Sequence, residues 1–114
     1  MATVDTETNE ATLESLRKVR RKLYSIPEAE LDAMSQEDQV KYGDSLHQNG
    51  LAVLKLEAAQ LKGVNDAFKA KEQELKTTAA SVEQNIAALD DAVEIVRVAS
   101  EGLVLVTNII KLLA

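Results

Sequence analysis

Apolar residues recur at helical spacing along most of the chain, and one repeat dominates. Every seventh residue from 54 to 110 is apolar: Leu54, Leu61, Phe68, Leu75, Val82, Leu89, Val96, Leu103 and Ile110. The companion row, three positions earlier in each repeat, is only partly apolar and includes Asn65 and Glu72. A sustained seven-residue repeat is typical of helices that pack along one another. The pattern predicts an all-α, coiled-coil-like protein.

Start and stop signals divide this pattern into helices. Asn9 is a suitable N-cap for a first amphipathic helix, and Pro27 fits the first turn of a second one. The expected helices cover about 9–25, 28–34, 36–75 and 79–113, within one all-helical domain over 9–114. Residues 1–8 are small and polar, without apolar periodicity, and are expected to form a flexible tail.

The long repeat fits two architectures. Residues 36–113 could form one continuous helix, or a helix that reverses near Lys76–Thr78 and returns antiparallel. The hairpin is favoured, because Ser81 and Gln84 have capping-box spacing and residues 76–81 lack large apolar side chains. The expected fold is therefore an elongated helical bundle built on a long antiparallel hairpin, with a shorter N-terminal helix.

The last third of the chain is apolar on every face of its predicted helix. Such a helix must be enclosed by its own bundle or by a partner. Gly102 lies within it and would permit a close helix crossing or a bend. A homodimer, or a complex with another helical protein, is expected. The candidate interaction residues are Leu89, Val96, Leu103, Val104, Val106, Ile109 and Ile110.

Composition narrows the chemistry. The 114 residues include no Cys, one His and four Gly, and the formal net charge is −6. The lack of Cys excludes disulfides and thiolate metal sites, and the glycines form no phosphate-binding loop. His47 has no second metal-ligating neighbour and is expected to be a partly buried, hydrogen-bonded core residue. No catalytic residue, cofactor, metal, small-molecule substrate or nucleic-acid partner is expected.

Two charged clusters remain. Arg17, Lys18, Arg20, Arg21 and Lys22 form a candidate docking patch for an acidic partner or for phosphate groups. The competing interpretation is internal pairing, of Lys18 with Glu14 four residues earlier and of the cluster with the acids that follow, which are Glu28, Glu30, Asp32, Glu37, Asp38 and Asp44. The second cluster, Asp90, Asp91 and Glu94, is expected to be a solvated stripe near Arg97.

These features indicate a non-enzymatic interaction or scaffold protein that acts through helix–helix association. The alternative hypothesis is a membrane-active or secreted helical component. In general outline the chain is similar to components of α-helical pore-forming toxins and to small helical secretion chaperones. The stretch 102–110 is too short to span a bilayer, and the acidic first residues do not resemble a signal peptide. A cytoplasmic location is expected, with signal-less secretion as the other route.

Overall fold

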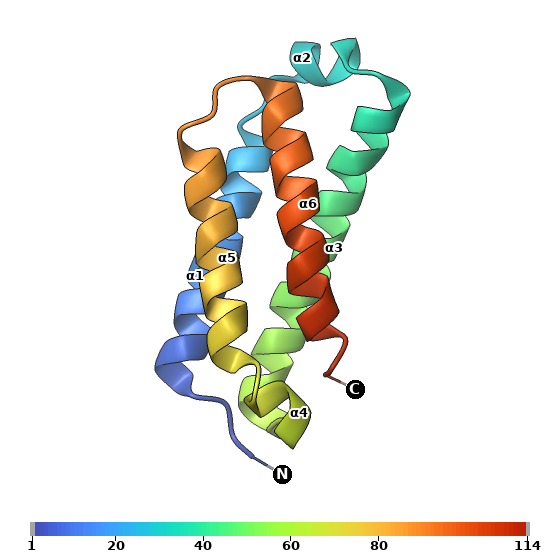
Figure 1. Cartoon of the computed structure of the whole chain (residues 1–114). Helices are drawn as coiled ribbons and strands as arrows, with labels where there is room; N and C mark the ends of the chain where they lie inside the picture. Colours follow the sequence, from blue (N-terminus) through green and yellow to red (C-terminus); the bar gives the residue numbers. More distant parts are fainter. Residues whose placement is uncertain (1, 114) are drawn as a thin grey trace.

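The structure, a computed structural model, describes residues 2–113 as an all-α bundle and confirms the predicted fold class. Figure 1 shows its six helices. They are α1 (Thr6–Tyr24), α2 (Glu28–Ala33), α3 (Gln36–Lys62), α4 (Asp66–Lys69), α5 (Glu72–Ala87) and α6 (Ala92–Ile110).

Four long helices form the body of the bundle, which measures 47 × 24 × 18 Å. Helix α1 packs against α5 and α3, and α6 packs against the same two helices from the opposite corner. In Figure 1, α1 and α5 run upward, whereas α3 and α6 run downward. The two short helices, α2 and α4, lie at opposite ends. Of the four neighbouring pairs, α1 and α3 share the least extensive contact.

The helix predicted over 36–75 ends at Lys62. Gly63 follows with φ 82° and ψ 178°, a conformation that side-chain-bearing residues rarely adopt. Asn65 then caps the short helix α4, its side chain accepting a hydrogen bond from the Phe68 backbone N–H at 2.8 Å. Because these two residues turn the chain, the first reversal precedes the predicted one, and Lys76–Thr78 lies inside α5.

The helix predicted over 79–113 is also two elements. Helix α5 ends at Ala87, and Asp91 caps α6 by accepting a hydrogen bond from the Glu94 backbone N–H at 2.9 Å. Helices α5 and α6 form an antiparallel hairpin whose reversal lies at residues 88–91. Asp90, Asp91 and Glu94 are exposed, as expected for a solvated stripe, and Asp91 and Glu94 also have capping-box spacing at the start of α6.

The N-terminal segment is packed against the body, which corrects the expectation of a flexible tail over its described residues; Met1 lies outside them. Ala2 and Val64 form an antiparallel bridge, with N–H to carbonyl distances of 2.9 and 2.7 Å. Asp5, rather than Asn9, caps α1. The buried Glu72 carboxylate accepts the Asp5 backbone N–H at 2.8 Å and pairs with Lys69 at 2.7 Å.

The seven-residue row lies in the core from Phe68 onward, despite the intervening loops. Phe68, Leu75, Val82, Val96, Leu103 and Ile110 are buried, and Leu89 is half-buried. A Cβ added at Gly102 would lie 2.2 Å from Val82 Cγ2, so the predicted close crossing occurs between α5 and α6. Leu54 and Leu61 are exceptions, because both lie on the outer surface.

Candidate helix-docking surface on α3

The inner face of α3 is small and polar for a core face. Its buried residues are Asp38, Ser45, Asn49, Ala52, Leu56 and Ala59. Leu56 is the only large aliphatic side chain among them. Core positions are ordinarily filled by Leu, Ile, Val or Phe, and buried polar groups need hydrogen-bond partners. The orientation of α3 is therefore determined by specific polar contacts as well as by apolar burial.

Two asparagines make these contacts between α1 and α3. The Asn49 Nδ2 group donates to the Leu16 carbonyl oxygen at 2.8 Å, and the Asn9 Nδ2 group donates to the Leu56 carbonyl oxygen at 3.3 Å. Both asparagines are buried. Rotating α3 about its axis would leave these amides unpaired in the core, at a cost of about 1–3 kcal/mol each. The asparagines thus hold the inner face of α3 toward α1.

Asp38 fixes the other side of α3, toward α6. The buried carboxylate accepts hydrogen bonds from Arg97 Nε and Nη2, both at 3.2 Å, and from Ser35 Oγ at 3.1 Å. The Arg97 hydrogen bonds are the main reason that the pKa of Asp38 lies below its ordinary value. Arg97 therefore pairs mainly across the bundle with Asp38, and the charge of Asp91 also helps to raise the pKa of Arg97.

The outer face of α3 carries the apolar residues that its inner face lacks. The exposed fractions are 55% for Val40, 41% for Leu51, 66% for Leu54 and 91% for Leu61. Val40, His47, Leu54 and Leu61 follow one another at seven-residue intervals, and Leu51 lies beside them. At 3.6 residues per turn these five residues share one face, here called the outer row. It lies opposite the buried face of α3.

His47 belongs to this outer row, so the expectation of a partly buried core histidine is wrong. Its side chain is exposed, and no hydrogen bond to it is present in the described part of the chain. The seven-residue phase placed it correctly beside Leu54. The error was to place this seven-residue row of α3 in the core, because α3 exposes its most regular apolar row to solvent.

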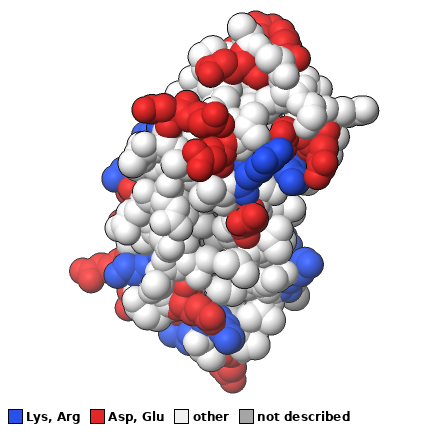
Figure 2. Space-filling view, turned by 45° about the horizontal axis from the view of Figure 1, so that its top comes forward, with Lys and Arg blue, Asp and Glu red and all other residues white. Residues whose placement is uncertain are grey.

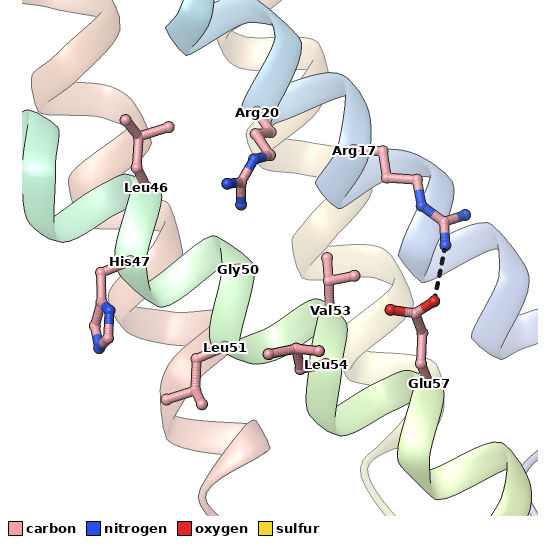
Figure 3. Close-up of a pocket in the computed structure, with 9 residues that line it drawn as sticks. All are labelled: Arg17, Arg20, Leu46, His47, Gly50, Leu51, Val53, Leu54 and Glu57. Atoms are coloured by element: carbon pink, nitrogen blue, oxygen red, sulfur yellow. Dashed lines mark ion pairs between the residues drawn. The ribbon is translucent and has the colours of Figure 1, made fainter.

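A groove separates α1 from α3 beside the outer row (Figure 3). It encloses about 590 Å³ and is lined by Arg17, Arg20, Leu46, His47, Gly50, Leu51, Val53, Leu54 and Glu57. One wall is α1 with its two arginines, and the other is α3 with its aliphatic residues. Arg17 pairs with Glu57 across the groove, with 3.6 Å between Nη2 and Oε2.

Arg20 lies over the middle of the groove. Its Nη1 atom is 2.9 Å from the position that a Cβ on Gly50 would occupy, so Gly50 leaves room for the guanidinium. The Nη2 group donates to the Tyr24 hydroxyl at 3.1 Å, and the guanidinium carbon is 5.3 Å from the centre of the Tyr24 ring. Within residues 2–113, no carboxylate forms an ion pair with Arg20.

Internal pairing of the rest of the basic cluster is confirmed for Lys18, which lies 3.7 Å from Glu14 as expected and 3.9 Å from Glu83. Lys22 donates to a carbonyl oxygen of α5 and does not pair with the acids that follow the cluster. The acids of α2 instead point to solvent. Figure 2 shows red side chains gathered at the end of the bundle that α2 covers. Only Arg17 and Arg20 of the cluster line the groove.

The predicted interaction residues of α6 lie mostly inside the bundle. Val96, Leu103, Val106, Ile109 and Ile110 are buried, Leu89 is half-buried, and Val104 is exposed. Most of the apolar surface of α6 is thus enclosed by the chain's own helices, one of the two outcomes expected for it, although Val104 and Leu105 remain 48% and 58% exposed. The longer exposed apolar row lies on α3. The sequence signal for this surface was a set of polar residues of α3, such as Asn49, on the helix face opposite the heptad row.

Other chemistry is sparse in the described residues. No group of three or more His, Asp or Glu side chains there could hold a metal ion. None of the helices formed by residues 2–113 is long and apolar enough to cross a membrane. Comparison with protein-family models, curated proteins and solved structures finds no match to this chain.

Proposed function

We propose that this protein is a non-enzymatic interaction protein that associates with other helices through the outer row of α3. One observation carries the proposal: α3 places four large aliphatic side chains in water while it buries Asp38, Ser45 and Asn49. A free-standing bundle would be more stable with the opposite arrangement. Retention of apolar residues on one outer face is typical of a surface that another molecule covers.

The free energy available from this surface is substantial. Full burial of a leucine side chain contributes about 1.5–3 kcal/mol. Leu54 and Leu61 are 66% and 91% exposed, so a partner that covers both would gain most of this amount from each. The neighbouring groove extends the contact to Leu46 and Val53. Helix-in-groove docking uses this combination of an apolar stripe and an adjoining groove.

Self-association, expected from the sequence, is one form of this function, and docking of another helical protein is the other. The membrane-active alternative would use the basic cluster beside Leu13, Leu16 and Leu23. All three leucines are buried in the core, so that role would require α1 to leave the bundle. No contact or exposure in the structure favours it over helix association. We propose a cytoplasmic location, with signal-less secretion as the alternative; fractionation of the source cells tests this.

The experiment uses the absence of cysteine. A single environment-sensitive dye is attached to Leu54→Cys, and a control dye to Gln84→Cys on the exposed surface of α5. The labelled proteins are titrated with unlabelled protein and, separately, with an amphipathic helical peptide. The proposal expects a blue shift at position 54, and none at 84, in at least one titration. Unchanged emission at position 54 in both titrations, up to about 1 mM, would overturn it.

A further inference from the structure

The groove between α1 and α3 contains an arginine, Arg20, for which residues 2–113 provide no counter-ion. Arg17 pairs with Glu57, whereas Arg20 forms a hydrogen bond only with Tyr24 among the described residues. Arg20 as a whole residue is half-buried beside Leu46, Gly50 and other groove residues, and its hydrogen bond to Tyr24 is exposed to solvent. A guanidinium with free donors is suited to a charge-assisted hydrogen bond with a carboxylate. The groove is therefore suited to an occupant that brings a carboxylate to Arg20.

The other side of the outer row is basic as well. Lys55 and Lys62 border a second hollow, between α3 and Leu113. From residue 46 to residue 62, α3 itself has one acid, Glu57, and Arg17 already pairs with it. The lower part of the outer row thus lies between positive charges on both sides, although the whole chain has a net charge of −6. Farther up the helix, Glu37 pairs with Lys41, and Asp44 is exposed.

This charge placement argues against a second copy as the occupant. A closed two-fold dimer brings the same face of each copy together, so the positive side chains of Arg20, Lys55 and Lys62 would meet a second face with the same positive side chains. Like charges brought together at an interface disfavour that pairing. Three exposed acids that form no ion pair within residues 2–113, Glu28, Glu30 and Asp32, lie on α2 at the end of the bundle (Figure 2). Contact between that end and the groove would be head-to-tail and would not close into a dimer.

The groove also has the form of a helix site. The space of about 590 Å³ is open along its length and lies between two helices. The missing Cβ of Gly50 lets the Arg20 guanidinium lie close to α3, between the two walls of the groove. Leucines on α3 then provide the apolar contact.

We infer that this groove binds an amphipathic helix of another protein, with an apolar stripe against Leu51 and Leu54 and an acidic side chain paired with Arg20. This inference rests on the proposed function and specifies its partner. The stripe would have apolar residues at three- and four-residue intervals, and acidic residues would flank it. The carboxylate provides orientation and selectivity, while the leucines provide most of the apolar burial.

The test uses synthetic helical peptides about three heptads long. One peptide has leucines along a single stripe and glutamates beside it, and its matched control has glutamine in place of every glutamate. Binding to the unlabelled protein is measured by isothermal titration calorimetry, and the site by amide chemical shifts in NMR. The protein variants are Arg20→Gln and, as a control, Arg21→Gln, an exposed member of the same basic cluster outside the groove.

The glutamate peptide should bind the wild-type protein about tenfold or more tightly than the glutamine peptide. This preference should disappear in Arg20→Gln and persist in Arg21→Gln, with shifted amides confined to the groove. Equal binding of both peptides by the wild-type protein, or the same preference in Arg20→Gln, would overturn the acidic-helix assignment. A dye at position 54 that becomes buried only when the protein is concentrated would also overturn it, while leaving helix association by the outer row supported.

Discussion

The orientation of α3 can be tested with two leucines that are two residues apart. Leu54 is 66% exposed and Leu56 is fully buried, although both occupy the same helix and would be replaced by the same residue, alanine. Leu56→Ala removes core contacts and leaves a cavity, which costs about 2–5 kcal/mol. Leu54→Ala removes contacts mainly with water, so its effect on the free energy of unfolding should be below about 0.5 kcal/mol.

Urea unfolding followed by far-ultraviolet circular dichroism measures both variants. A loss of about 3 kcal/mol, at a slope of about 1.5 kcal/mol per M, moves the urea midpoint by about 2 M. Leu56→Ala should show a displacement of this order, and Leu54→Ala almost none. The comparison is made in dilute protein and repeated at higher concentration, because any self-association through Leu54 would make its effect depend on concentration.

An equal loss of stability in the two variants, measured in dilute protein, would refute the reasoning. It would mean that α3 is rotated, so that the heptad row containing Leu54 faces the core. The outer row and its proposed partner would then lose their basis. A further variant, Leu61→Ala, provides an independent check, because this residue is 91% exposed and its replacement should also be nearly neutral.

Three further predictions concern the residues that fix the helices. Gly102→Ala would place a Cβ 2.2 Å from Val82 Cγ2. The cost of this overpacking should exceed the gain in helix propensity, so the free energy of unfolding should fall by about 1–2 kcal/mol, as measured by thermal unfolding. Gly43→Ala, with no atom within 4 Å of its Cβ, should instead stabilise by about 0.5–1 kcal/mol; similar effects at both glycines would contradict the close crossing. Asn49→Ala removes the 2.8 Å hydrogen bond to a carbonyl of α1 and should cost about 1–3 kcal/mol in urea unfolding, whereas a neutral result would exclude this bond as an anchor of α3. The pKa of Asp38 is lowered from 3.8 in the folded chain, so its contribution to stability is present above that pH and is lost as the pH falls through the lowered pKa. Asp38→Asn should therefore lower the free energy of unfolding near neutral pH and make it fall less as the pH is lowered, as measured by urea unfolding from about pH 6 to pH 2. If the fall in acid is unchanged in this variant, other carboxylates cause it.

The sequence by itself determined the fold class and most of the core. Low glycine and proline content and the seven-residue repeat predict helices, and from Phe68 onward the repeat lies in the bundle interior as expected. The reversals were harder to locate, because each depends on a few local residues. Gly63 adopts a positive φ and Asp91 accepts a capping hydrogen bond, yet both lie within an unbroken heptad phase. Periodicity records which residues share a face and is insensitive to a short loop that preserves the phase.

Only the tertiary structure decided which face of α3 is buried. Its outer row has the more regular apolar pattern, so periodicity alone assigns Leu54 and Leu61 to the core. The bundle instead buries Asn49 and Asp38, because the Asn49 Nδ2 group donates to a carbonyl of α1 and Arg97 of α6 donates to Asp38; the buried Asn49 Oδ1 atom has no hydrogen-bond partner within residues 2–113. These partners lie far away in the sequence and are brought together only by folding. The same packing buries most of α6, apart from Val104 and Leu105, and leaves the longer exposed apolar row on α3.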